Sequence, residues 1–149
     1  MMINYNLATS QKVSEILDMM ANFYAIDKYP FNRIKSENNL LTFIDDASLG
    51  LLYLIENNSE TMGYICITFG FSFEYGGRIA FVDEFYLKPE YRNQGIGSQV
   101  MEFIERKSID LEVKSLLLEV EKHNSHAQGL YAKQGFKSKG RPLLSKRIN

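Results

Sequence analysis

The residues of this chain best suited to chemistry form one short stretch, Arg92-Asn93-Gln94-Gly95-Ile96-Gly97, between an apolar run and an amphipathic segment. Two glycines at a strand-to-helix junction let the backbone turn tightly and bring its N–H groups close to a ligand. The first N–H groups of a helix lack internal partners, and the helix dipole adds partial positive charge there. The junction therefore suits a phosphate or pyrophosphate, for which Arg92 adds a permanent charge and forked donors.

The spacing of the glycines excludes two common phosphate-binding motifs. A dinucleotide fingerprint needs a third glycine three residues after Gly97, where Val100 stands. A Walker A loop needs Gly-Lys-Ser/Thr, but Gly97 is followed directly by Ser98. The remaining pattern, Arg-x-x-Gly-x-Gly after a strand, is by itself equally consistent with a tight turn that binds nothing.

The elements that must position this loop follow from hydrophobic periodicity and turn residues. The patterns predict the order β-α-α-β-β-β-α-β-α-β-β. Strands are expected at 2–7, 51–56, 61–73, 78–88, 116–121, 136–138 and 143–148, and helices at about 9–25, from 36, from 97 and from 125. Gly135 stands where a helix C-cap glycine belongs.

Composition narrows the class of protein. The 149 residues correspond to one domain, and 45% hydrophobic residues can fill a core. A net charge of −1 gives no global basic field for nucleic acid. No signal peptide or membrane-length apolar run is recognisable, and the single cysteine, Cys66, fits a reducing compartment. We therefore expect a cytoplasmic protein that binds neither nucleic acid nor membrane.

Three separated pieces of the chain, in order and at consistent spacing, resemble the GNAT superfamily of acetyl-CoA-dependent N-acetyltransferases. The loop Arg92–Gly97 resembles the pyrophosphate loop of the family. The segment Glu119–Asn124 resembles the strand that flanks the cofactor. The segment Ala127–Phe136 resembles the family's tyrosine helix, with Asn124 and Tyr131 seven residues apart as the family pattern requires.

The resemblance covers essentially the whole chain and implies a single N-acetyltransferase domain over residues 1–149. The implied fold is α/β (α+β), with a mixed, mostly antiparallel sheet of about seven strands and four helices. The implied co-substrate is acetyl-CoA. Its binding residues would be the backbone of Phe85, Tyr86 and Leu87, the loop residues Arg92, Asn93, Gln94, Gly95, Ile96 and Gly97, and Asn124, which could instead cap the following helix.

The resemblance also implies direct attack of an amine on the thioester, with no covalent enzyme intermediate. Tyr131 would act as the general acid that protonates the departing thiolate. An alkylammonium must lose a proton before it attacks, so a base is needed, and Asp83, Glu84 and Glu119 are the candidates. Neighbouring strand residues face opposite sides, so one of Asp83 and Glu84 would face the cleft unless a bulge changes the alternation.

The expected acceptor is a small amine. The run from Gly63 to Phe69 and the sequence from Asp83 to Leu87 most resemble the small-amine branch, which includes diamine and polyamine acetyltransferases. Acidic and aromatic groups would suit such a cation. The residues expected to line its pocket are Tyr24, Asp27, Glu74 and Glu84, together with Tyr29 and Phe71.

His123 and His126 do not form a convincing metal pair, so no metal is expected.

Two other functions stay open from the sequence. One is acetylation of a protein N-terminus or lysine. The other is a non-catalytic sensor that binds an acyl-CoA without turnover, although the presence of Tyr131 and Asn124 argues against it. Dimers are common in folds of this resemblance, so a homodimer also stays open.

Overall fold

The computed structural model describes residues 1–149 and divides into two compact units, residues 1–119 and residues 120–149. The first unit contains the β-sheet and three α-helices, and the second contains one α-helix. A single N-acetyltransferase domain over the whole chain stays a prediction.

The first unit is built on a five-stranded sheet in the order β1-β2-β3-β4-β5. Its strands are β1 (Asn4–Leu7), β2 (Gly50–Asn57), β3 (Glu60–Ser72), β4 (Gly77–Leu87) and β5 (Ser115–Leu117). All neighbours pair antiparallel except β4 and β5, which run parallel. Parallel strands need a long crossover, and here it carries the glycine loop and a helix.

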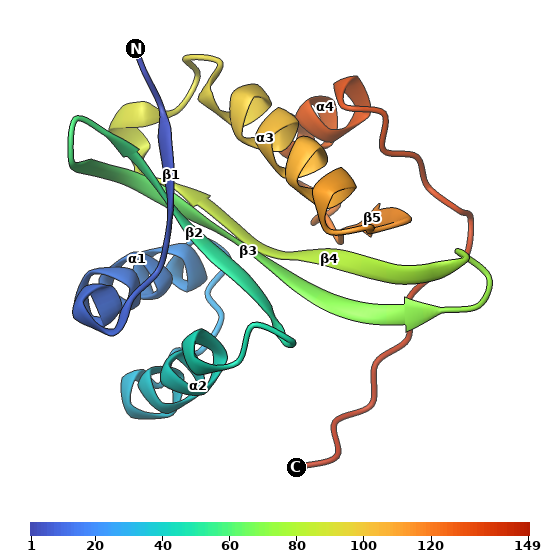
Figure 1. Cartoon of the computed structure of the whole chain (residues 1–149), viewed down its shortest axis with the longest axis horizontal. Helices are drawn as coiled ribbons and strands as arrows, with labels where there is room; N and C mark the ends of the chain where they lie inside the picture. The colour runs from blue at the N-terminus through green and yellow to red at the C-terminus, as the bar shows by residue number, and fades with distance from the viewer. The chain divides into compact units, whose positions relative to one another are not determined.

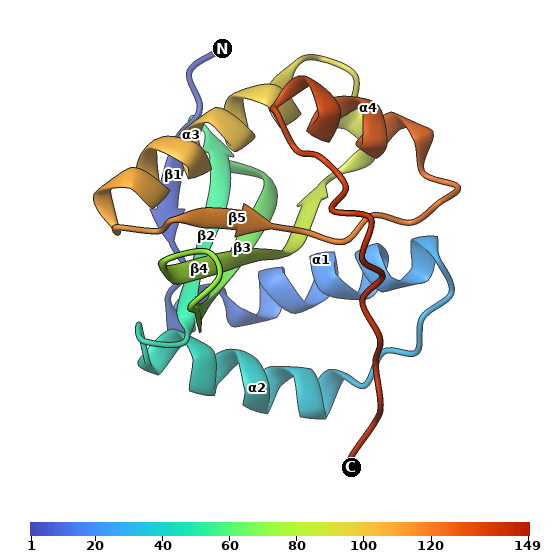
Figure 2. The same cartoon turned by 90° about the vertical axis from the view of Figure 1, so that its right-hand side faces the viewer.

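Two faces of this sheet are covered by helices (Figures 1 and 2). Helices α1 (Val13–Ile26) and α2 (Arg33–Asp45) lie on one face, and α3 (Ile96–Asp110) lies on the other. The core on the α1 side contains Val13, Ile16, Leu17, Met19, Leu40, Leu52, Leu54, Tyr64, Cys66 and Tyr86. Side chains alternate along β3, so Ile65 and Ile67 are buried toward the α3 side.

None of the helices is both long enough and apolar enough to cross a membrane.

The connection between β2 and β3 is a two-residue hairpin. Asn58 and Ser59 both adopt positive φ, 50° and 67°. A two-residue turn of this kind matches the twist of the flanking strands, and Asn tolerates the left-handed region well. The break between the predicted strands 51–56 and 61–73 is therefore a tight turn, and it fixes the register of β2 against β3.

The mixed α/β class and the four helices are confirmed, but the predicted number of seven strands is wrong. Residues 136–138 and 143–148 form no strand, and β5 has three residues instead of the predicted six. Leu144 and Ile148 are 88% and 81% exposed. An apolar stretch becomes a strand only when a neighbouring strand accepts its hydrogen bonds, and these residues have none.

The second unit contains α4 (Ser125–Lys133), whose two ends are both capped. Asn124 begins the helix, since its side-chain oxygen accepts the N–H of Ala127 at 3.0 Å. At the other end Gly135 has φ 91°, the N–H of Gly135 reaches the Ala132 carbonyl, and that of Phe136 reaches the Tyr131 carbonyl. These two bonds make a Schellman motif, so the predicted C-cap role of Gly135 is confirmed.

Candidate active site

The glycine loop leads into α3, whose N-terminus has no side-chain cap. Gly95 is the N-cap of α3, with φ 78°, and no side chain bonds to the first helical amides. The first helical hydrogen bond runs from the Gln99 N–H to the Gly95 carbonyl. The amides of Ile96, Gly97 and Ser98 are therefore available as donors, and the helix dipole favours an anion beside them.

The side chains of the loop fasten it to the protein. Arg92 Nε donates to the Leu87 carbonyl at 2.8 Å, and its guanidinium carbon lies 5.4 Å from the Tyr86 ring centre. Gln94 Nε2 donates to the Glu90 carbonyl at 2.7 Å. The terminal nitrogens of Arg92 keep unused donors. The loop thus offers an anion mainly backbone N–H groups, with the Arg92 charge held beside the end of β4.

Beside this loop, β4 has an open edge within the first unit. Its pairing with β5 covers Ile79, Ala80 and Phe81 only. The N–H of Lys88 donates to the Met62 carbonyl of β3 at 2.8 Å. N–H groups alternate along a strand, so the Tyr86 amide faces β3.

By the same alternation, the amides of Phe85 and Leu87 face the open edge of β4. The carbonyl of Leu87 accepts Arg92 on that side, which agrees with the assignment, because the N–H and C=O of a strand residue point the same way. Two of the three backbone donors predicted for the cofactor are therefore directed away from β3, and Tyr86 is not.

A β-bulge interrupts the pairing of β3 and β4 at the predicted acidic pair. Cys66 pairs with Glu84 and Ile67 pairs with Val82, which leaves Asp83 as the extra residue. A bulge disturbs the strict alternation of faces. Glu84 lies on the α1 side, where it accepts the Tyr24 hydroxyl. Asp83 is close enough to the Cys66 thiol and the Tyr24 hydroxyl to raise the pKa of both, as Glu84 does.

The carboxylate of Glu84 is held by two phenols. Tyr24 of α1 donates its hydroxyl to one oxygen at 2.5 Å, and Tyr64 of β3 donates to the other at 2.8 Å. Burial raises the pKa of Glu84, and the two phenol hydrogen bonds oppose that rise. Burial, together with the charge of Glu84 and the hydrogen bond to it, also raises the pKa of Tyr64. The two phenols are therefore protonated donors to this carboxylate.

Asp83 stands beside this cluster in a different environment. Its side chain reaches solvent and makes no hydrogen bond or ion pair, and partial desolvation raises its pKa. Cys66, by contrast, is buried, and burial strongly raises the pKa of its thiol. A thiol in such surroundings is inert, so Cys66 serves as a packed core residue.

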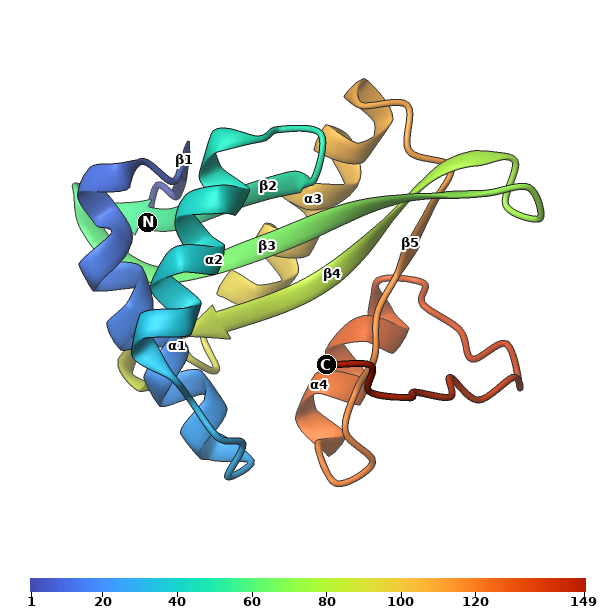
Figure 3. The same ribbon diagram turned by 90° about the horizontal axis from the view of Figure 1, so that it is seen from below.

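The structure does not bring together every residue predicted for the acceptor pocket. Asp27 ends α1 one turn after Tyr24, so these two share the end of one helix. Glu74 lies in the turn 73–76, at the far tip of the β3–β4 hairpin (Figure 3). That tip is eight residues along β3 from Cys66, or about 26 Å at the rise of a strand. Glu74 therefore does not join Tyr24 and Glu84.

Glu119 lies two residues beyond the end of β5 and is exposed. The expected strand through residue 121 ends at Leu117, so no pairing fixes the Glu119 side chain. Within the second unit, the Tyr131 ring packs edge-on against Phe136 at 5.8 Å, and Asn124 caps the helix as the sequence allowed.

Tyr64 is the site residue that the sequence reasoning missed. It lies in an apolar run and reads as core, and its side chain is fully buried. The available signal was a phenol two positions before Cys66 on the same strand face. A buried hydroxyl needs a partner, and the register supplies Glu84 on the neighbouring strand.

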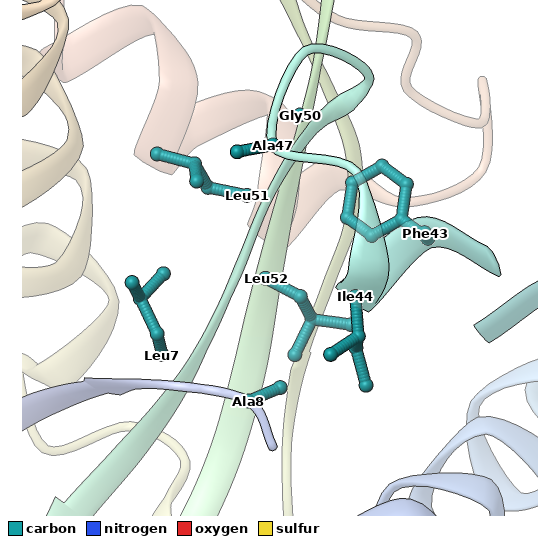
Figure 4. A pocket seen from close by; sticks show the side chains of 8 residues that line it. All are labelled: Leu7, Ala8, Phe43, Ile44, Ala47, Gly50, Leu51 and Leu52. Carbon is teal, nitrogen blue, oxygen red and sulfur yellow. The ribbon is translucent and has the colours of Figure 1, made fainter. Parts of the chain in front are cut away.

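An apolar pocket elsewhere in the first unit is not a catalytic site (Figure 4). It is lined by Leu7, Ala8, Phe43, Ile44, Ala47, Gly50, Leu51 and Leu52. These side chains have no titratable or nucleophilic group, and no predicted site residue is among them.

A mixed sheet in which β4 has an open edge, followed by a glycine loop and an uncapped helix, fits the acyltransferase class of protein. Residues 14–136 match the acetyltransferase (GNAT) family, and the chain belongs to that family. The resemblance noted from the three sequence segments is therefore confirmed.

Individual relatives agree with this membership. A thialysine N-epsilon-acetyltransferase of Bos taurus is 35% identical over 74 residues, which are 50% of this chain and 43% of that protein. The chain therefore spans less than half the length of that relative. An integron cassette protein from the mobile metagenome of Cole Harbour Salt Marsh is 30% identical, with a TM-score of 0.86 over 97% of this chain and 90% of that one.

A predicted acetyltransferase of Clostridium acetobutylicum, solved with acetyl-CoA, shares the fold. Its TM-score is 0.81 at 16% identity, covering 97% of this chain and 96% of that one.

Proposed function

We propose that this protein transfers the acetyl group of acetyl-CoA to the primary amine of a small cationic molecule. The observation that carries the proposal is the pairing of two donor sets on one chain segment. The amides of Phe85 and Leu87 face the open edge of β4, and the uncapped N-terminus of α3 begins nine residues after Leu87.

These donors fit the chemistry of the co-substrate. Acetyl-CoA supplies an activated acetyl thioester and, farther along, a pyrophosphate. The N-terminus of α3, with Gly95 in the left-handed region and Arg92 nearby, suits the pyrophosphate. The amides at the open edge suit a carbonyl oxygen, and their hydrogen bonds would strengthen as negative charge develops on it.

Two proton transfers accompany the reaction, and we assign both to side chains. The amine nitrogen forms a bond to the acetyl carbon, and the bond from that carbon to sulfur breaks. We assign the proton lost by the ammonium to Asp83, through water, because this carboxylate is unpaired and has a raised pKa. Glu119 is the weaker candidate, because it is exposed beyond the end of β5. Tyr131 would protonate the departing thiolate.

The acceptor is inferred from charge and from a relative. Tyr24 and Asp27 place an aromatic and an acidic group at the end of α1, where a cation is favoured. The bovine relative is named for the epsilon nitrogen of thialysine, a primary amine on a small molecule. Both observations favour a small cationic amine over a protein substrate.

The test is a product assay with acetyl-CoA and a panel of acceptors. The panel contains diamines, polyamines, lysine and thialysine, with neutral amines, acidic amines and peptides of matched concentration. We expect acetylated product with the small cationic amines and at least tenfold lower kcat/KM with the others. Turnover restricted to peptides, or to neutral and acidic amines, contradicts the proposed acceptor. Binding of acetyl-CoA with no product from any acceptor contradicts catalysis.

A further inference from the structure

We infer that Glu84 is a positioning residue, locked between the phenols of Tyr24 and Tyr64 to hold α1 on the β4 bulge, and is neither the base nor the carboxylate that binds the acceptor. This inference rests on the proposed acetyl transfer and reassigns one residue expected to line the acceptor pocket.

The lock consists of the two hydrogen bonds that Tyr24 and Tyr64 donate to the carboxylate of Glu84. Each oxygen of Glu84 accepts one hydroxyl, from Tyr24 on a helix and from Tyr64 on a neighbouring strand. Hydrogen bonds to an ionised acceptor are about twice as strong as neutral ones. Tyr64 is fully buried, so its hydroxyl has no water to replace Glu84. A carboxylate that leaves this position to take a proton would strand a buried donor.

Aromatic packing holds Tyr24 in place on the helix side of the lock. The Tyr24 ring meets Phe23 and Phe31 edge-on, with ring centres 6.1 and 5.5 Å apart. Phe23 in turn packs on Tyr64 and on Tyr86. The Tyr24 hydroxyl is thus presented to β4 by an aromatic cluster that spans α1, the segment after it, and two strands.

The lock lies directly beside the open edge of β4 in the sequence. Glu84 immediately precedes Phe85, the residue whose amide faces that edge, and follows the bulged Asp83. A bulge loosens a strand locally, because its extra residue is left unpaired in the ladder. Fixing the side chain of Glu84 therefore fixes the direction of the Phe85 amide and of the Asp83 carboxylate on either side.

The two carboxylates consequently differ in their freedom to act. Asp83 is unpaired and exposed, whereas both oxygens of Glu84 are engaged. The titratable groups that face Glu84 are Tyr24 from α1, Tyr64 from β3 and Asp83 from β4; Cys66, also of β3, is its strand partner. Asp83 alone among them is a carboxylate with solvent access and no hydrogen-bond partner.

The experiment compares Glu84→Gln, Asp83→Asn and Tyr24→Phe with the matched control Tyr53→Phe, whose ring packs on Phe103 of α3. The readouts are the pH profile of kcat/KM and hydrogen exchange of the α1 amides. Glu84→Gln should lower kcat about tenfold and keep the acidic limb of the profile. Asp83→Asn should abolish that limb. Tyr24→Phe and Glu84→Gln should both speed exchange in the last two turns of α1 at least fivefold, with Tyr53→Phe at the wild-type rate.

Loss of the acidic limb in Glu84→Gln, or unchanged exchange in both Tyr24→Phe and Glu84→Gln, would overturn the inference. The exchange measurement needs no turnover. It therefore tests whether the hydrogen bonds to Glu84 hold α1 in place, even if the protein transfers no acetyl group. Absence of product from the wild-type protein counts against the proposed function alone. A thermal melt of each variant shows whether a variant with reduced kcat is still folded.

Discussion

At the scale of single residues, Cys66 separates direct attack from a route through an acetylated thiol. The thiol is buried, its pKa is raised by that burial, and the charges of Asp83 and Glu84 act in the same direction. A thiolate, the nucleophilic form, is therefore scarce at neutral pH.

We expect Cys66→Ala to retain at least half of the wild-type kcat and to lose about 1 kcal/mol of stability, because a small buried side chain is shortened. Steady-state kinetics and chemical denaturation measure the two effects. A fall in kcat to background in a folded Cys66→Ala protein contradicts direct attack.

Tyr131 carries the other residue-level prediction. Phenylalanine keeps the ring that packs on Phe136 and removes only the hydroxyl. General acids typically contribute a factor of about 100 or more, so Tyr131→Phe should lower kcat by roughly 100-fold. The dissociation constant for acetyl-CoA should stay within twofold of wild type, as measured by calorimetry. Unchanged turnover would remove Tyr131 from the mechanism.

At the scale of elements, two glycines in different elements should respond oppositely to the same substitution. A Cβ on Gly63 of β3 would lie 2.0 Å from the Tyr86 carbonyl oxygen, a backbone atom that cannot move aside. Gly63→Ala should therefore cost roughly 1–3 kcal/mol or more, by forcing β3 away from β4.

Gly129 provides the matched control, because it lies inside α4 and an added Cβ would meet no atom within 4 Å beyond its chain neighbours and the backbone of its own helix. Gly129→Ala should stabilise the helix by up to about 1 kcal/mol. Urea denaturation followed by circular dichroism compares both variants with wild type. Equal effects in the two variants would contradict the close approach of β3 and β4 at Gly63.

The elements also show which features a sequence can reveal. The turn at Asn58 and Ser59 and the C-cap at Gly135 depend on local backbone chemistry, so residue types were enough to predict them. The bulge at Asp83 depends on how β4 pairs with a strand about twenty residues earlier. The hydrogen bond between Tyr64 and Glu84 follows from that register, so no local sequence pattern predicts it.

The strand predictions were wrong where no neighbouring strand is present to pair with the segment. Residues 143–148 have the composition of a strand, but alternation alone supplies no neighbour for their backbone groups. The same reasoning explains Glu74, whose charge suited a cationic acceptor but whose position at the hairpin tip could not be read from composition.

At the scale of the whole molecule, charge is nearly balanced, with 17 basic and 18 acidic residues. No long-range field attracts a polyanionic co-substrate. Its affinity must then come from local features, above all the uncapped N-terminus of α3 and the nearby charge of Arg92. Binding of the co-substrate therefore depends on one loop and on the open edge of β4 beside it.

The most direct test is isothermal titration of acetyl-CoA into the wild-type protein and into the double variant Arg92→Ala, Gly95→Ala. The control is the double variant Arg33→Ala, Gly76→Ala, because Arg33 pairs with Asp18 on the surface and Gly76 has positive φ in an open turn. We predict micromolar binding for the wild type and the control, with binding lost in the loop variant. Absence of binding to the wild-type protein, or equal binding to all three proteins, would contradict the account.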